Sequence, residues 1–355
     1  MAFETVCADR GPRAATGGRA GGRTLWPPQF FAYIEFVFSK GEGEGVEDVE
    51  VARRLGGPPR ILQADIIGHP RLAEARRHYL DRFLKLYDGE PFLVRLLIES
   101  GRFSLYHLAL VLEAAQDPAR RETWLTTGLL KTWLATLGMA SGRHVDHLVA
   151  RLQEVGYVAS EPSPRDRRVR ILSLTEKARA HDRAWLAAHY APLQVLYPEH
   201  DYACALRPAA DFQVLHRRTS LGFAGLGARL WLSEPHMMLF MNHAAGYPIV
   251  AALLDAATRA DERHAAVRYA DIGHRFGVSH TQVRKLLVAA EDRGLVKLHA
   301  RGGQKVEIRP ELWAAHDRGI AGGMYYHDVV FVATMNASDA LTQLEAGHTV
   351  NAIEA

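Results

Sequence analysis

The chain holds very little cysteine, since Cys7 and Cys204 are its only two thiols in 355 residues. Two cysteines so far apart exclude a disulfide framework and a thiolate metal cluster, and they are typical of a reducing compartment. Long apolar runs are also missing, because Arg, His, Gly or Pro interrupts each candidate before the ~18 residues of a membrane span. The arginines near the N-terminus are not followed by the apolar segment of a secretory signal. We therefore expect a cytoplasmic protein with no membrane partner.

Net charge is low as well, since 43 Lys and Arg stand against 40 Asp and Glu, a formal charge of +3. A polyanionic partner would therefore require basic side chains that are concentrated locally. The 48% hydrophobic and 23% charged residues are typical of a globular protein, and the length allows two or three domains. Residues 8–24 are rich in Gly, Ala and Arg, so we expect residues 1–25 to form a disordered basic tail.

Local catalytic motifs are absent from the sequence. No His-Glu-x-x-His, Gly-x-Ser-x-Gly or Walker sequence occurs, and the glycines of residues 222–227 lack the flanking strand and acid of a dinucleotide site. We therefore predict no catalytic residue and no cofactor. An enzyme with a dispersed site stays an alternative, because such a site leaves no local trace.

An internal repeat is the most informative pattern in the chain. SGRHVDHLVARLQEVGYV (141–158) aligns with SHTQVRKLLVAAEDRGLV (279–296) at one constant offset. The identities are Ser141 with Ser279, Val145 with Val283, Leu148 with Leu286, Gly156 with Gly294 and Val158 with Val296. Downstream, VRI at 169–171 matches VEI at 306–308 after a loop that is one residue shorter. Two copies this far apart indicate a duplication rather than a solenoid.

Each copy predicts a short helix followed by a β-hairpin. Ser141 and Ser279 are placed as N-caps, and Gly156 and Gly294 stand where a glycine with positive φ ends a helix. The apolar face of each helix is expected to be buried; it holds Val145, Leu148, Val149 and Leu152, or Val283, Leu286, Leu287 and Ala290. The opposite face must meet solvent or a partner; it holds Arg143, His144, His147 and Arg151, or His280, Thr281, Gln282, Arg284 and Lys285.

The first copy and its hairpin carry the most specific signal. GRHVDHLVARLQEVGYVASEPSPRDRRVRILSLTEKA (142–178) resembles the recognition helix and wing of the MarR (multiple antibiotic resistance regulator) family, and PRDRRVRILSLTEKA is its specific part. The second copy resembles winged-helix domains more generally, and its wing lacks the Asp-Arg signature. The resemblance covers roughly 91–190 and 245–316.

This resemblance implies that each helix enters the major groove of duplex DNA while the wing tip lies on the minor groove. It assigns wing contacts to Arg165, Arg167 and Arg168 in the first copy, and to Arg301, Gln304 and Lys305 in the second. Arginine suits this position because a narrow minor groove concentrates negative potential. Asp166 is expected to orient a neighbouring arginine, since a bare carboxylate beside phosphates is repelled. The residues expected to reach base edges are Arg143, His147, Gln282 and Arg284.

The predicted fold is therefore mainly α with small β-wings (α+β), with two winged helix-turn-helix domains in tandem, additional packing helices and a pseudo-two-fold relation. The expected segments are a tail (1–25), an N-terminal packing segment (26–69), a first winged-helix domain (70–190), a helical connector (191–240), a second winged-helix domain (241–316) and a C-terminal packing segment (317–355). The predicted function is a transcriptional regulator that binds double-stranded DNA, as a monomeric pseudo-dimer or a homodimer. A winged-helix scaffold for protein–protein assembly is the alternative.

Smaller patterns carry further expectations. His144 and His147 lie three residues apart, but no acid or cysteine nearby completes a metal site, so no metal is predicted. Met237, Met238, Phe240 and Met241 are expected in the core, with a pocket for a small-molecule effector beside their helix as the alternative. Cys204 is expected to be a buried structural thiol, with an oxidant-sensing thiol as the alternative. YYHDVVFVAT (325–334) favours a strand, and Ser338 is placed to cap a last helix that ends at Ala346.

Overall fold

The computed structural model describes residues 44–88, 91–98, 100–136, 140–164, 166–260, 263–300 and 305–353. The predicted tail, the packing segment through residue 43 and the wing residues Arg165, Arg301 and Gln304 lie outside this described part. The described residues are mainly helical, with a two-stranded and a three-stranded antiparallel sheet, and they fall in one unit, Lys40–Ala355. The coarse class, mainly α with small β elements, is thereby confirmed.

The first of the two repeated segments consists of helices, then a β-hairpin, and then one long helix. In order these elements are α6 (Ser100–Ala115), the 3₁₀ turn η1 (Arg121–Thr123), α7 (Thr127–Thr136), α8 (Gly142–Glu154), β1 (Val158–Pro162), β2 (Arg170–Leu174) and α9 (Glu176–Leu196). β1 and β2 pair antiparallel, with Val158 opposite Leu174. The N–H of Leu172 donates to the carbonyl of Leu125 at 2.8 Å, so the segment after η1 adds a third stretch of backbone to the hairpin.

The second repeated segment shows the same order of elements. It consists of α14 (Gly246–Thr258), β3 (His264–Ala265), α15 (Tyr269–Phe276), α16 (His280–Asp292), β4 (Val296–Leu298), β5 (Val306–Ile308) and α17 (Pro310–Ile353). The strands form an antiparallel sheet in the order β3-β5-β4. In the first segment Leu125 pairs with β2, and in the second segment the short strand β3 pairs with β5. Leu125 and β3 therefore occupy equivalent positions in the two segments.

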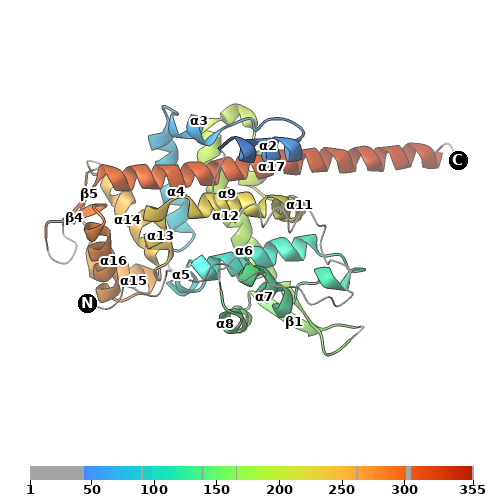
Figure 1. The fold of residues 1–355 in the computed structure, drawn as a ribbon, viewed down its shortest axis with the longest axis horizontal. Helices are drawn as coiled ribbons and strands as arrows, with labels where there is room; N and C mark the ends of the chain where they lie inside the picture. Colours follow the sequence, from blue (N-terminus) through green and yellow to red (C-terminus); the bar gives the residue numbers. More distant parts are fainter. Residues whose placement is uncertain are drawn as a thin grey trace. The chain divides into compact units, whose positions relative to one another are not determined.

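Further helices precede and join the two segments. α2 (Glu44–Leu55), α3 (Gln63–Ile67), α4 (Leu72–Lys85) and α5 (Pro91–Leu97) come first. Between α9 and α14 lie η2 (Pro198–His200), α10 (Ala203–Leu206), α11 (Ala210–Ser220), η3 (Leu221–Phe223), α12 (Ala224–Leu232) and α13 (Pro235–Met241). α4 packs on α9 and α14, and α17 packs on α3, α9, α11 and α12 (Figure 1). One cluster of buried apolar side chains thus joins helices from both repeated segments, including Leu80, Leu193, Leu253 and Val330.

α17 corrects two sequence-based expectations. Residues 325–334 were expected to favour a strand and Ser338 to start a helix, but both lie inside this single helix. Val329, Val330 and Phe331 are buried, with 0%, 0% and 4% exposure. Strand preference reflects packing on a half-buried surface more than the backbone itself, and here the same side chains fill a helix interface. α17 also runs across the predicted boundary at residue 316.

No single described helix is long and apolar enough to cross a membrane. α13 and α14 reach that length and composition only as a pair, and they meet at a bend of 113°.

Candidate nucleic-acid interface and cavity

α8 is held at both ends by local hydrogen bonds. The Oγ of Ser141 accepts the N–H of His144 at 3.4 Å. At the other end Gly156 has φ of 72°, and the N–H groups of Tyr157 and Gly156 donate to the carbonyls of Leu152 and Gln153 at 2.8 and 3.0 Å. This pair of bonds is a Schellman motif, which requires a residue that tolerates positive φ. The predicted serine cap and glycine stop are both confirmed.

α16 has the same ends with one addition. Ser279 accepts the N–H of Gln282 at 3.1 Å, and the side-chain oxygen of Gln282 accepts the N–H of Ser279 at 2.9 Å, which closes a capping box. Gly294 has φ of 70°, and Leu295 donates to the carbonyl of Ala290 at 2.9 Å. The capping box occupies the oxygen of Gln282, one of the residues expected to reach base edges.

The two helices bury the predicted faces. Their buried residues are Val145, Leu148, Val149 and Leu152 on α8, and Val283, Leu286, Leu287 and Ala290 on α16. On the opposite face of α16, His280, Thr281, Gln282, Arg284 and Lys285 are all exposed. On α8, Arg143 and His147 are exposed, while His144 and Arg151 are half-buried and Arg151 is paired with Glu154. Each helix therefore presents basic side chains to solvent from the side away from the core.

The first hairpin also presents cations. Arg167 and Arg168 are exposed. Asp166 accepts one hydrogen bond from the N–H of Arg168 and one from the guanidinium of Arg121, both at 3.1 Å. An arginine next to Asp166 was expected, but Arg121 comes from η1 and was not foreseen. It reaches the hairpin because Leu125 pairs with β2, a long-range contact that no local pattern shows.

The second hairpin is basic around one carboxylate. Lys305, a predicted wing residue, is exposed. Glu307 on β5 is 7% exposed and forms ion pairs with Arg263 and Arg309, each at 3.2 Å. His299 lies 2.6 Å from the same carboxylate, and its hydrogen bond is the largest of the effects that lower the pKa of Glu307 to about 2. These four residues were not among the predicted site residues.

The expectations about single residues have mixed outcomes. Neither His144 nor His147 joins a group of three His, Cys, Asp or Glu side chains within metal-binding distance in the described part of the chain. Cys204 was expected to be buried but is only half-buried, and this burial raises the pKa of its thiol, which disfavours the reactive thiolate. Of the four residues expected in the core, Met237 and Phe240 are buried with 6% and 0% exposure, whereas Met238 and Met241 are only half-buried.

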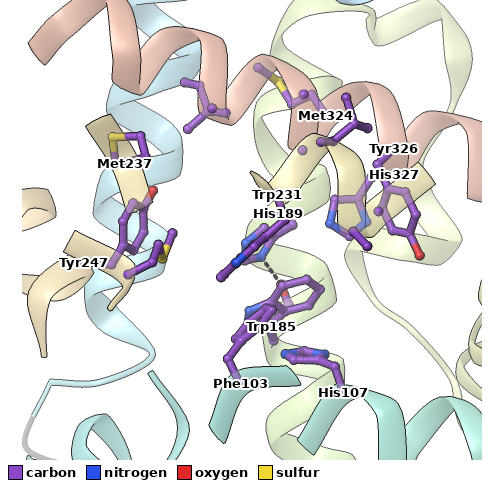
Figure 2. Close-up of a pocket in the computed structure, with 18 of the residues that line it drawn as sticks. Phe103, His107, Trp185, His189, Trp231, Met237, Tyr247, Met324, Tyr326 and His327 are labelled. Atoms are coloured by element: carbon purple, nitrogen blue, oxygen red, sulfur yellow. Dashed lines mark hydrogen bonds between the residues drawn. The ribbon is translucent and has the colours of Figure 1, made fainter. Parts of the chain in front are cut away.

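A cavity of about 300 Å³ lies beside α13, where an effector pocket was the alternative reading. Its walls come from α4, α6, α9, α11, α12, α13, α14 and α17, and so from both repeated segments and the connector. Two pairs of stacked rings form part of the wall (Figure 2): Trp185 with His189, and Phe103 with Trp231, with centroids 3.7 and 4.7 Å apart. Met237, Met241 and Met324 add flexible apolar surface.

The cavity wall carries neutral imidazoles and phenols, together with Arg217 and Glu234, which form ion pairs with Asp182 and Arg318. Burial lowers the pKa of His189 to about 4, and it lowers the pKa of His107 and His327 well below 6.5. Tyr247 donates a hydrogen bond to Tyr79 at 3.0 Å, and burial raises the pKa of both phenols. Nδ1 of His327 is buried without a hydrogen-bond partner. The wall therefore combines an aromatic and thioether surface with neutral polar groups and two charged side chains that are paired.

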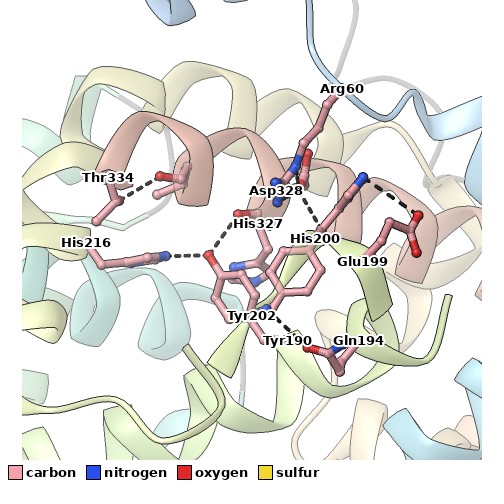
Figure 3. A network of polar contacts seen from close by, with 11 residues as sticks. Arg60, Tyr190, Gln194, Glu199, His200, Tyr202, His216, His327, Asp328 and Thr334 are labelled. Atoms are coloured by element: carbon pink, nitrogen blue, oxygen red, sulfur yellow. Dashed lines mark hydrogen bonds and ion pairs between the residues drawn. The ribbon is translucent and has the colours of Figure 1, made fainter. Parts of the chain in front are cut away.

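A separate network of buried polar groups fastens α17 to its neighbours (Figure 3). Asp328 of α17 accepts hydrogen bonds from Arg60 and from the hydroxyl of Tyr202, each at 2.6 Å at the closest. The hydroxyl of Tyr190 donates to the carbonyl of His327 at 2.8 Å and lies 2.8 Å from Nε2 of His216. Because that hydroxyl has a single proton, Nε2 of His216 must be the donor. This network ties α9, α11, Tyr202 at the start of α10 and Arg60 before α3 to α17, and it explains why polar residues are buried there.

No family model, curated protein or solved structure matches the chain.

Proposed function

We propose that the chain is a transcriptional regulator that binds double-stranded DNA through two MarR-like winged helices acting as an intramolecular pseudo-dimer. The first winged helix is α6 to β2 and the second is α14 to β5. The observation that carries the proposal is the pair α8 and α16, each with a buried apolar face and an exposed basic face, and each followed by an antiparallel hairpin. A helix of this size fits the major groove of B-DNA, and cations on the adjoining hairpin reach the backbone.

The basic side chains are concentrated where the proposal needs them. A chain with a formal charge of only +3 places Arg143, Arg167 and Arg168 on the first winged helix and Arg284 and Lys285 on the second, all exposed. Neutralised phosphates release counterions, so the logarithm of the binding constant falls linearly with the logarithm of the salt concentration. Fluorescence anisotropy of the full chain with a labelled duplex, across a salt series, measures this slope. A flat response or no binding would favour the protein–protein scaffold instead.

Matched variants sharpen this test. Arg143→Ala and Arg284→Ala remove one exposed cation from each helix and are expected to weaken binding. Lys85→Ala removes an exposed cation from α4, where the side chain is 68% exposed, and is expected to leave binding nearly unchanged. Equal losses in all three variants would show that the helices are not the binding surface.

The two basic faces are not alike, and this predicts an asymmetric binding site. α8 presents Arg143 and His147, whereas α16 presents Arg284 and Lys285. Different donors select different bases, at ~1–3 kcal/mol for each good bidentate contact. Selection of bound duplexes from a random pool is expected to yield two unlike half-sites. A perfect palindrome would instead indicate that two whole chains pair on the DNA.

The cavity supports a second part of the proposal, a small-molecule effector. Its aromatic walls and neutral imidazoles favour a flat, uncharged ligand over an anion, because the charges of Arg217 and Glu234 in the wall are already paired with Asp182 and Arg318. N-phenyl-1-naphthylamine, a neutral fluorescent probe, is expected to bind more tightly than its sulfonated analogue 1-anilinonaphthalene-8-sulfonate. Tighter binding of the sulfonate would contradict this assignment. Helices of both repeated segments line the cavity, α6 and α9 from the first and α14 and α17 from the second. A bound ligand would therefore contact both segments at once.

A further inference from the structure

Three side chains that are far apart in the sequence meet on one face of the second sheet. His264 lies on β3, and Glu307 lies directly opposite it on the central strand β5. His299 follows β4, and its N–H donates to the carbonyl of Lys305 at 3.1 Å, which places it diagonally across from Glu307. Residues that face each other across antiparallel strands point to the same side of the sheet, as do residues two apart on one strand. The two imidazoles and the carboxylate therefore share one face.

The ligand atoms are close enough to hold one ion. One such atom from each of His264, His299 and Glu307 lies within 4.8 Å of the other two. Tetrahedral zinc, with bonds of ~2.0–2.2 Å, holds its ligand atoms about 3.4 Å from one another. Binding of the ion requires side-chain rotations that bring the three atoms to that spacing, while the strand pairing already fixes the backbone positions.

The carboxylate of Glu307 has one oxygen available for this role. Oε1 accepts hydrogen bonds from Arg263 and Arg309, each at 3.2 Å. Oε2 meets the imidazole of His299 at 2.6 Å. An ion between Oε2 and His299 replaces the shared proton of that hydrogen bond, while the two guanidinium groups keep hold of Oε1 and orient the carboxylate. Such outer partners are a regular part of metal sites.

We propose that His264, His299 and Glu307 bind a divalent transition metal, preferably Zn²⁺, at the base of the second hairpin (β4 and β5). Two imidazoles and one carboxylate are a nitrogen and oxygen donor set that zinc accepts, with water as the fourth ligand. Water has access, since the side chain of His299 is 32% exposed while that of Glu307 is 7% exposed. The bound ion ties β3 to both strands of the hairpin that carries Lys305. The proposal goes beyond DNA binding and does not depend on it.

Titration of the chelator-treated full chain with Co²⁺ tests the site, because Co²⁺ in a four-coordinate site absorbs strongly in the visible. We expect a band that saturates at one equivalent and disappears when Zn²⁺ is added. The His264→Ala/His299→Ala variant is expected to lose the band, whereas His274→Ala, which removes an exposed histidine of α15, keeps it. Zn²⁺ should also raise the Tm of the unaltered chain but not that of the double variant.

The absence of a saturable band, or a band that persists in the double variant, would overturn the site. Loss of the band in His274→Ala would do the same, because it would place the ion elsewhere. Far-UV circular dichroism of each variant confirms that the helices are retained. Neither the Co²⁺ titration nor the Tm measurement uses DNA. These results therefore test the metal site even if the chain does not bind DNA.

Discussion

His189 stacks on Trp185 in the cavity wall, with ring centroids 3.7 Å apart and planes 27° from parallel. Its Nδ1 lies 2.9 Å from the carbonyl of Trp185, so the imidazole is held by its own helix. Burial lowers the pKa of His189 to about 4, and the pKa values of His107 and His327 are lowered well below 6.5 by the same cause. Between about pH 4 and pH 6.5, the imidazole of His189 is therefore neutral in the folded protein but protonated in the unfolded chain. His107 and His327 differ between the two states in the same direction.

This difference predicts a loss of stability in mild acid. A folded-state pKa below the unfolded value of 6.5 means that the unfolded chain binds more protons at intermediate pH, so stability is full above pH 6.5 and falls as the pH approaches 4. For His189 alone the loss at pH 5 is roughly 2 kcal/mol. Urea unfolding at pH 7.5 and pH 5.0 measures it. His189→Phe keeps a stacked ring without the titration, and it should show a smaller pH dependence; an equal dependence would exclude His189 as a source.

The first hairpin predicts unequal roles for its arginines. Arg167, Arg168 and Arg170 are all exposed, but the guanidinium of Arg170 donates to the hydroxyl of Ser160 at 2.8 Å and also to the carbonyl of Ser160. On the proposed interface, Arg167→Ala and Arg168→Ala should each reduce the salt slope of DNA binding by about 0.9, the value for one phosphate contact. Arg170→Ala should reduce it less. An equal reduction for Arg170→Ala would mean that charge alone, and not the hairpin geometry, governs binding.

The local features of the two repeated segments could be predicted because their causes are local. A serine cap, an apolar face at helical spacing and a glycine with positive φ are each set by a few neighbouring residues, and Ser141, Val145 and Gly156 behave as expected. The error at 325–334 has the opposite origin. Val329, Val330 and Phe331 read as a strand in isolation, but their burial against other helices decides the conformation.

The sites that the sequence missed are all made by long-range contacts. Arg121 reaches Asp166 only because Leu125 pairs with β2. His264 and Glu307 become neighbours only through the pairing of β3 with β5. A pocket beside α13 was an alternative that the sequence offered, but its lining could not be predicted, since its stacked rings, such as Phe103 on Trp231, come from different helices. The spacing of residues within one segment does not predict such tertiary contacts.

Replacing Gly156, the glycine that ends α8, should lower the free energy of unfolding through backbone strain alone. A Cβ at Gly156 would meet no atom within 4 Å, but the residue has φ of 72°. Gly156→Ala should therefore destabilise the protein by about 1 kcal/mol. Gly57 also has open space and no positive φ, so Gly57→Ala is the matched control and should be neutral or slightly stabilising. Urea midpoints compare the two, and a Gly156→Ala variant as stable as Gly57→Ala would refute the strain.

Two further glycines predict opposite effects around the cavity. A Cβ at Gly246, the first residue of α14, would lie 2.0 Å from the carbonyl oxygen of Phe240, which is backbone and cannot turn aside. Gly246→Ala should therefore shift the corner between α13 and α14 and lower the free energy of unfolding by more than about 2 kcal/mol. Gly323 lies within α17 and lines the cavity, and a Cβ there would meet nothing within 4 Å.

Gly323→Ala should accordingly stabilise the protein by about 0.5–1 kcal/mol, because alanine loses less backbone entropy than glycine in a helix. Gly323→Leu places a larger side chain at the cavity wall and should weaken binding of N-phenyl-1-naphthylamine at least tenfold while the fold is kept. Urea unfolding and a fluorescence titration give the two values. Unchanged probe binding in Gly323→Leu would show that the probe occupies another site, because the leucine side chain takes up part of the cavity volume.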